Sequence, residues 1–214
     1  MDLTKSALLL AGSGGTMAAG AYATKDYWMP IKEKAQEVKS IRDSLKGRKL
    51  ISSFVGEALT KQWEEEFDSD AENIKTLLKD TSLVKTTGGT ALSKWCSEQM
   101  PLDADKNPEI LKNVEKYCLI RSVSDQLSRK GKKLLGEGDQ DGWSKTYKKR
   151  KEKSTNRAEV GLQETWKEDQ ESNELPTIKT WCSANSAADF TDSGADSIYT
   201  KVLKWCTEDG ATTD

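Results

Sequence analysis

The stretch SIRDSL at residues 40–45 decides the fold, because the related stretch SVSDQL returns 82 positions later, at residues 122–127. A second pair, KGRKLI and KGKKLL, follows at an offset of 84, at residues 46–51 and 130–135. Self-similarity at a regular spacing predicts a repeated structural unit. Three further matches keep the same order: Trp63 with Trp143, Trp95-Cys96-Ser97 with Trp181-Cys182-Ser183, and Val114, Lys116, Tyr117 and Cys118 with Val202, Lys204, Trp205 and Cys206.

These matches predict two tandem units and divide the chain of 214 residues into four parts. Residues 1–25 form a signal peptide or signal anchor, and residues 26–121 form the first unit with a lead-in helix. Residues 122–209 form the second unit, and residues 210–214 form a tail.

Apolar residues inside the units recur at three- and four-residue spacing, which is typical of amphipathic helices. No stretch alternates apolar and polar residues as a half-buried strand does, so the predicted class is all-α. The segments 81–90 and 136–142 are rich in Gly, Thr or Asp and predict loops. Four helices are specified most clearly: one from Pro30 to Gly47, one capped by Ser69 or Asp70, one opened by Asn107-Pro108, and one opened by Ser193 with Ile198, Val202 and Cys206 on one stripe.

Each of the four cysteines directly follows an aromatic residue, and each unit contains two. The duplication favours disulfides within a unit, Cys96 with Cys118 and Cys182 with Cys206, across 22 and 24 positions. Each closed loop contributes on the order of 3 kcal/mol in the chain-entropy description. Four cysteines allow three connectivities, and four buried free thiols are the alternative. Zinc fits poorly because the chain has no CxxC and no histidine, so no metal or cofactor is predicted.

The uncharged run SALLLAGSGGTMAAGAYA, residues 6–23, is a predicted membrane segment. Eighteen helical residues span about 27 Å, which matches a hydrocarbon core. Its Ala21-Tyr22-Ala23 end also suits signal-peptide cleavage. Lysines after the run, from Lys25 onward, favour a body that stays in the cytoplasm, whereas disulfides favour an oxidising exterior.

Composition excludes several enzyme classes. With no histidine, the chain cannot form a Ser/His/Asp or Cys/His nucleophile arrangement or an HExxH zinc site. A net charge of −2 gives no general attraction to nucleic acid. The carboxylates of Glu64–Glu66 and of Glu168 and Asp169 are candidate acids or bases, but no nucleophile accompanies them and solvated helix faces explain them better.

A basic run beside Trp143 and Tyr147 is a candidate polyanion-binding patch. Such binding needs cations and stacking rings, and a solvated helix face is the alternative. The residues of this patch are Lys145, Lys148, Lys149, Arg150, Lys151 and Lys153, with Arg157 just beyond them.

Several short motifs carry a family resemblance over nearly the whole chain. They are a Gly/Ala-rich start, KGRKLIS at residues 46–52, Trp63 within KQWEEEF, KWC at residues 94–96 and 204–206, and KYC at residues 116–118. With them the chain resembles the large paralogous families of uncharacterised proteins in hemotropic mycoplasmas. The resemblance implies a surface-exposed or exported product with a role in host interaction or antigenic diversity, and it brings no catalytic residues.

The sequence therefore predicts a non-enzymatic surface protein at the cell membrane, with its body outside, or a secreted protein if residues 6–23 are cleaved. Its predicted partners are the membrane, through that segment, and a host protein or glycan. The alternative is a cytoplasm-facing or soluble helical scaffold with reduced cysteines. The sequence does not predict an oligomeric state.

Overall fold

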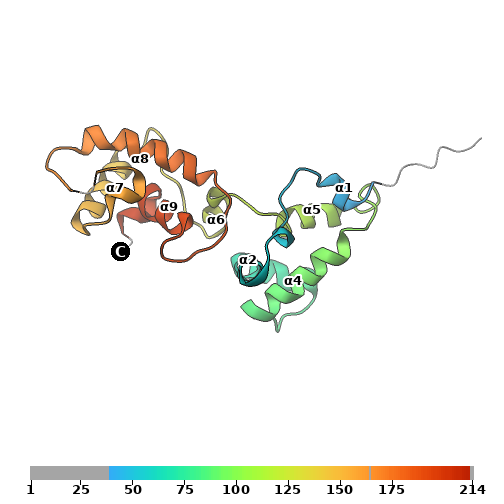
Figure 1. Ribbon diagram of the computed structural model, residues 1–214. Helices are drawn as coiled ribbons and strands as arrows, with labels where there is room; N and C mark the ends of the chain where they lie inside the picture. Colours follow the sequence, from blue (N-terminus) through green and yellow to red (C-terminus); the bar gives the residue numbers. More distant parts are fainter. Residues whose placement is uncertain (1–38, 164, 213–214) are drawn as a thin grey trace, which may run out of the picture. The chain divides into compact units, whose positions relative to one another are not determined.

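The computed structural model describes residues 39–163 and 165–212, which form nine α-helices and three short 3-10 helices (Figure 1). Within these residues the extended segments form four isolated β-bridges but no β-strand. The all-α class is therefore confirmed. The apolar run 6–23 and the part of the lead-in helix before Lys39 lie outside the described residues.

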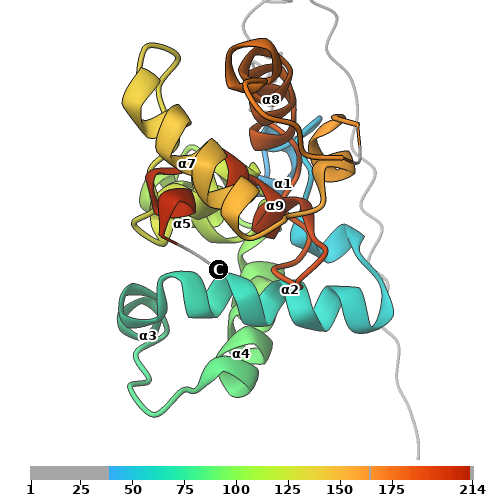
Figure 2. The same cartoon turned by 90° about the vertical axis from the view of Figure 1, so that its left-hand side faces the viewer.

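The buried apolar side chains form two clusters, one before and one after residue 121, and we call the corresponding parts the N-terminal lobe (residues 39–121) and the C-terminal lobe (residues 122–212). In the N-terminal lobe α4 packs against α2, and Figure 2 shows α3 following α2. The elements of this lobe are α1 (Ile41–Ser44), η1 (Ile51–Ser53), α2 (Gly56–Ser69), α3 (Ala71–Leu78), α4 (Lys85–Gln99) and α5 (Pro108–Tyr117).

In the C-terminal lobe α9 packs against α6, α7 and α8, and the short η3 covers α7 and α9. The elements of this lobe are α6 (Val123–Arg129), α7 (Gln140–Glu152), η2 (Arg157–Val160), α8 (Glu171–Ser186), α9 (Ile198–Cys206) and η3 (Glu208–Ala211).

The same local contacts recur in both lobes. Ser40 and Ser122 each accept a hydrogen bond from the backbone N–H three residues later and so cap α1 and α6. Gly47 and Gly131 both take a positive φ, 84° and 71°, in the turn that follows. The extended bridges correspond as well: Ser40 with Asp103 and Leu50 with Leu119 in one lobe, Ser122 with Asp189 and Leu134 with Thr207 in the other.

Two helix starts differ from the prediction. The backbone of Ser40 is extended (φ −66°, ψ 158°), so α1 begins there and does not continue from Pro30 as expected. α9 begins at Ile198, and Ser197 accepts the hydrogen bond from Thr200 N, whereas the prediction placed this role at Ser193. By contrast, α3 and α5 begin after Asp70 and Asn107 as predicted, although neither side chain accepts a capping hydrogen bond from the backbone of its helix.

The predicted loops at residues 81–90 and 136–142 are wrong in part, because α4 begins at Lys85 and α7 at Gln140. Gly88 and Gly89 lie inside α4, at the place where α4 packs so closely against α2 that a Cβ would not fit. A Cβ at Gly88 would stand 2.3 Å from the ring of Phe67, and one at Gly89 would stand 2.8 Å from the backbone nitrogen of Glu64. These glycines permit close helix packing and do not mark a turn.

The connection between α5 and α6, which Figure 1 shows as a ribbon, makes a backbone hydrogen bond to each lobe. Ile120 N donates to Lys49 O at 2.9 Å in the N-terminal lobe. Immediately afterwards Phe190 N donates to Arg121 O at 2.8 Å in the C-terminal lobe. The chain thus passes from one lobe to the other without a free linker residue between these two hydrogen bonds.

Candidate functional site

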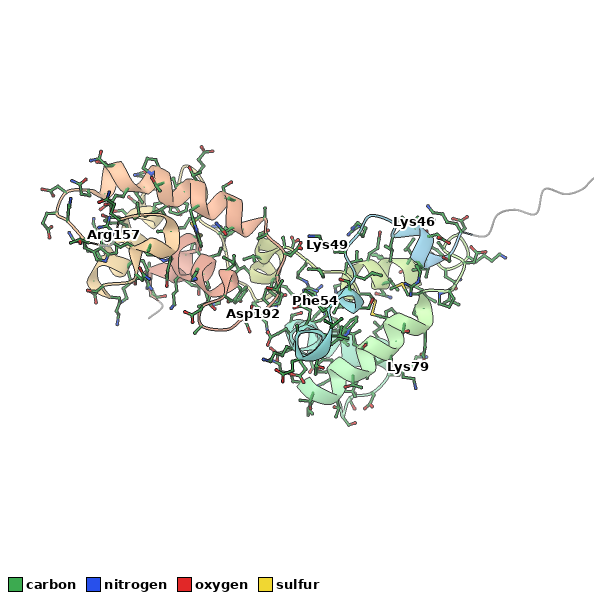
Figure 3. All side chains as sticks on the ribbon, viewed as in Figure 1. Lys46, Lys49, Phe54, Lys79, Arg157 and Asp192 are labelled. Atoms are coloured by element: carbon green, nitrogen blue, oxygen red, sulfur yellow. A yellow bond between two sulfur atoms is a disulfide. The ribbon has the colours of Figure 1, made fainter. Side chains whose placement is uncertain are left out.

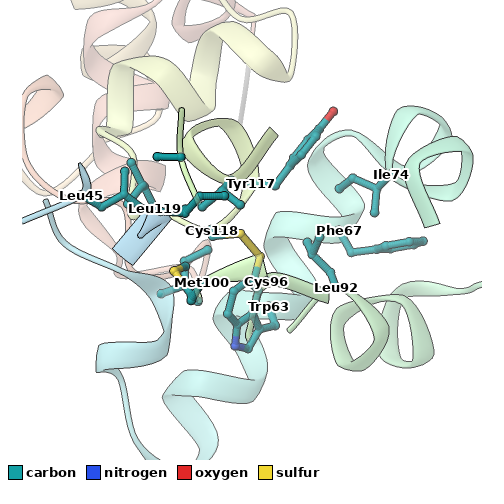
Figure 4. Packing of buried hydrophobic residues seen from close by; sticks show 14 of the residues in the cluster. Leu45, Trp63, Phe67, Ile74, Leu92, Cys96, Met100, Tyr117, Cys118 and Leu119 are labelled. Carbon is teal, nitrogen blue, oxygen red and sulfur yellow. A yellow bond between two sulfur atoms is a disulfide. The ribbon is translucent and has the colours of Figure 1, made fainter. Parts of the chain in front are cut away.

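The first disulfide joins Cys96 of α4 to Cys118 at the end of α5, with a Cα–Cα distance of 5.8 Å. Both cysteines are buried among the apolar side chains of the N-terminal lobe, close to Trp63 and Met100 (Figure 4). The bond ties two helices that are separated by the turn at residues 100–107, so it closes the core of this lobe.

The second disulfide joins Cys182 of α8 to Cys206, the last residue of α9, with a Cα–Cα distance of 5.6 Å. Both predicted pairings are therefore present in the structure. The aromatic residue before each cysteine has a consistent place. Trp95 and Trp181 are half-buried beside the first cysteine of each pair, and Tyr117 and Trp205 are buried beside the second.

The basic run on α7 presents fewer charges at the surface than the sequence suggested, because one of its members is buried. Arg150 is only 1% exposed and donates through Nη2 to Gly210 O at 3.0 Å, so its assignment to a surface patch is wrong. The reason is helical spacing: Trp143, Thr146 and Arg150 lie on the stripe of α7 that faces the core. Arg157 is also buried, and Figure 3 labels it within the C-terminal lobe.

Three lysines of the run face carboxylates. Lys151 Nζ lies 2.9 Å from Glu168, Lys149 lies 3.6 Å from Glu152, and Lys148 lies 4.0 Å from Glu171. Lys145 and Lys153 are exposed. Surface ion pairs of this kind contribute little to the stability of the fold. They do, however, neutralise part of the positive charge that would attract a polyanion.

The carboxylates next to Trp63 have separate environments. Glu64 and Glu65 are half-buried, and Glu65 lies 2.5 Å from Lys85 Nζ. Glu66 is only 2% exposed and is enclosed by Arg121 and Arg129.

Glu66 is the centre of a buried ionic cluster that connects the two lobes. Arg121 Nη2 donates to both carboxylate oxygens, and Arg129 Nη1 donates to Oε1 at 2.7 Å. Burial raises the pKa of the Glu66 carboxyl above its ordinary value, and the two guanidinium groups oppose that rise. Nearby, Gln62 Nε2 donates to Phe190 O at 3.1 Å. Separating the buried Glu66 carboxylate from either arginine would leave a buried charge without its counter-charge, at a high cost in free energy. The cluster therefore holds α2 and α6 in place relative to each other.

A second ionic cluster lies inside the C-terminal lobe. Arg157 donates to Glu174 Oε1, and Tyr147 Oη donates to Glu174 Oε2 at 2.7 Å. The guanidinium carbon of Arg157 lies 4.7 Å from the ring centroid of Trp166, which stacks on Trp205 at 6.2 Å. Burial and the hydrogen bond to Glu174 raise the pKa of Tyr147 well above its ordinary value, so its hydroxyl stays protonated as a donor.

Each lobe also has a hollow beside one of the two corresponding tryptophans, Trp63 or Trp143. The hollow at Trp143 has a volume of about 650 Å³ and is bordered by both cysteines of the second disulfide. Lys179 Nζ lies there, 5.4 Å from the ring centroid of Trp143. The hollow at Trp63 has a volume of about 630 Å³ and lies between α2 and α4. Both volumes fall in the range of small-molecule sites.

The ionic cluster at Glu66 was missed by the sequence reasoning, although one signal points to it. The offset between the matching stretches rises from 82 to 84 because Ser128 and Arg129 separate SVSDQL from KGKKLL, whereas KGRKLI follows SIRDSL directly. Arg129 is the residue that reaches across to Glu66. No comparable signal marks Arg157, whose partner lies 17 positions away.

Comparison with protein-family models, curated proteins and solved structures finds no match to this chain. None of the helices formed by residues 39–163 and 165–212 has the length and hydropathy that a membrane crossing requires.

Proposed function

We propose that this chain is a non-enzymatic surface protein, anchored in the cell membrane through residues 6–23, whose two tandem helical units are exposed outside the cell. The single observation that carries the proposal is that all four cysteines are used in two disulfides, one in each lobe. Structural disulfides are typical of proteins in oxidising environments and are rare in the cytosol.

Equivalent contacts support the tandem arrangement. The capping serines Ser40 and Ser122, the disulfides, and the extended bridges occupy corresponding positions in the two lobes. A duplicated unit that closes its own core with a disulfide suits a small extracytoplasmic domain, because such domains have too little apolar core to be stable without a covalent link.

The role that we assign is host interaction or antigenic diversity, as the resemblance to paralogous families of hemotropic mycoplasmas implies. The charged surface agrees with such a role, since solvated side chains vary with little effect on the core. Lys46 and Lys79, for example, are exposed on the N-terminal lobe (Figure 3).

The lysines that follow the apolar run favour a second candidate function, a cytoplasm-facing helical scaffold with reduced cysteines. The two candidates differ in cysteine oxidation and in the accessibility of the lobes. Both quantities can be measured on the same cells.

The test uses intact cells that produce the full chain. One portion of the cells is treated with a protease that does not enter cells, and an untreated portion is mapped by non-reducing mass spectrometry after thiol blocking. We expect the treated cells to lose peptides from residues 39–212, and the untreated cells to yield linked peptides that contain Cys96 with Cys118 and Cys182 with Cys206.

The matched control is a chain that lacks residues 1–25, which should remain inside the cell and be protected from the protease. Four blocked free thiols together with full protection of the complete chain would overturn the proposal and favour the scaffold. Recovery of residues 1–23 in the mature protein distinguishes an anchor from a cleaved signal peptide.

A further inference from the structure

The two corresponding tryptophans differ in one hydrogen bond. Trp143 Nε1 donates to Gly136 O at 2.8 Å. Trp63 is equally buried, with 4% of its surface exposed, but its Nε1 has no acceptor among the residues that the structure describes. A buried N–H without a protein acceptor carries a free-energy cost and is uncommon, so it requires an explanation.

The difference follows from where the helices begin. Trp143 is the fourth residue of α7, so the carbonyl of Gly136 lies in the preceding loop, where it accepts hydrogen bonds both from Asp139 N at 3.0 Å and from Trp143 Nε1. Trp63 is the eighth residue of α2, which begins at Gly56. The residues of the preceding turns are therefore helical, and their carbonyls point along the helix axis toward their own backbone N–H partners and not toward the indole.

The indole of Trp63 borders the hollow between α2 and α4. In Figure 4 its nitrogen lies at the end of the ring farthest from the disulfide. Residues with hydroxyl side chains from both helices line this hollow, and they are Thr60, Thr86, Thr90, Ser93 and Ser97.

The rim of the hollow carries both signs of charge. Lys94 and Glu98 face each other across 3.9 Å with side chains that are 77% and 56% exposed, and Glu64 also borders the hollow. Such an exposed ion pair rearranges at little cost, so it does not close the hollow to a ligand. Two carboxylates against one ammonium give an anionic ligand no advantage.

We propose that this hollow binds a neutral saccharide, with the N–H of Trp63 donating to a ligand oxygen. A sugar presents many hydroxyls that both donate and accept, which matches a lining of Ser and Thr hydroxyls. A peptide anchor is less suitable because Leu59 is the only aliphatic side chain larger than a methyl group among the residues that line the hollow. The inference depends on the contacts of α2 and α4 and holds for either orientation of the lobes relative to the membrane.

The test follows the indole signals of the full chain, labelled with ¹⁵N-tryptophan and with its disulfides intact, by NMR. Maltotriose, N-acetyllactosamine and triacetylchitotriose are titrated in a detergent without a sugar head group. We expect at least one of them to move the Trp63 indole signal while the Trp143 signal stays in place. Trp63→Phe should weaken that binding about tenfold, the usual effect of one lost hydrogen bond.

Ser97→Leu and Ser183→Leu form a matched pair, because both serines are exposed, follow a disulfide cysteine and border the hollow of their own lobe. Ser97→Leu should abolish binding, and Ser183→Leu should leave it unchanged. These surface changes keep the test decisive if Trp63→Phe disturbs folding. The proposal is overturned if none of the three saccharides moves the Trp63 signal, or if Ser183→Leu weakens binding as much as Ser97→Leu.

Discussion

Arg129 Nη1 lies 2.7 Å from Glu66 Oε1 and so connects α6 of one lobe to α2 of the other. The same guanidinium lies 5.3 Å from the ring centroid of Tyr117, the residue before a disulfide cysteine. Arg129 thus links the ionic cluster to the disulfide-closed core of the N-terminal lobe.

Glu66→Gln should destabilise the protein by about 3–5 kcal/mol, because Arg121 and Arg129 would then be held together without their counter-charge. Unfolding in urea, followed by circular dichroism, measures this loss. Glu72→Gln is the matched control, since Glu72 has a side chain that is 89% exposed and pairs with Lys75 at the surface. An equal loss of unfolding free energy in both variants would show that the buried ionic cluster is not the cause of the destabilisation.

Cys118→Ser should lower the free energy of unfolding by about 2–5 kcal/mol, the usual effect of removing a native disulfide from a small domain. The effect should fall on the N-terminal lobe, whose core contains both cysteines of this bond. Denaturation of the single variant and of the Cys96→Ser/Cys118→Ser variant should give similar midpoints. An unchanged midpoint in Cys118→Ser would show that the bond does not contribute to stability.

Gly89→Ala should destabilise the protein by about 1–3 kcal/mol, because its Cβ would stand 2.8 Å from the backbone nitrogen of Glu64 and 2.9 Å from the carbonyl carbon of Trp63. Backbone cannot move aside as a flexible side chain can. Gly136→Ala serves as the control, since a Cβ there meets no atom within 4 Å and the residue has no positive φ. Thermal unfolding should separate the two variants clearly.

Asp70 makes stability depend on pH in the acid range. Burial by itself raises the pKa of this carboxyl, but hydrogen bonds from Lys116, Asn73 and Tyr117 outweigh it and hold the pKa below its ordinary value. The stabilisation is therefore complete above the ordinary pKa and is lost as the pH falls through the lowered one, between about pH 5 and pH 2. Asp70→Asn should flatten the dependence of the urea midpoint on pH in this window, and an unchanged slope would contradict the assignment.

The apolar spacing predicted the helical class, because helical periodicity is a local property of the sequence. The duplication favoured the two disulfide pairings that the structure contains, although four cysteines allow three connectivities. The start of α9 was not predicted because Ser193 and Ser197 are both candidate caps. The start of α1 was not predicted because the apolar spacing extends back toward Pro30. Ser40 caps a helix only because an extended bridge to Asp103 fixes the backbone before it. That partner is 63 positions away in the sequence.

Gly88 and Gly89 show why the loop at residues 81–90 was mispredicted. Two adjacent glycines normally indicate a turn, but here the approach of α2 requires residues without a Cβ. Arg150 was misplaced for a related reason. A run of basic residues indicates a solvated face, whereas the period of α7 turns one member of the run inward.

The pairing of cysteines also limits how far the chain can be stretched. A pulling force applied at the two ends of the described region would pass through each sulfur–sulfur bond, and the 22- and 24-residue loops that the bonds close would carry no load. At about 3.5 Å per extended residue, roughly 160 Å of contour length stays hidden until the bonds are reduced. Under tension this protein would act as a short tether, and a reducing agent would convert it into a long one.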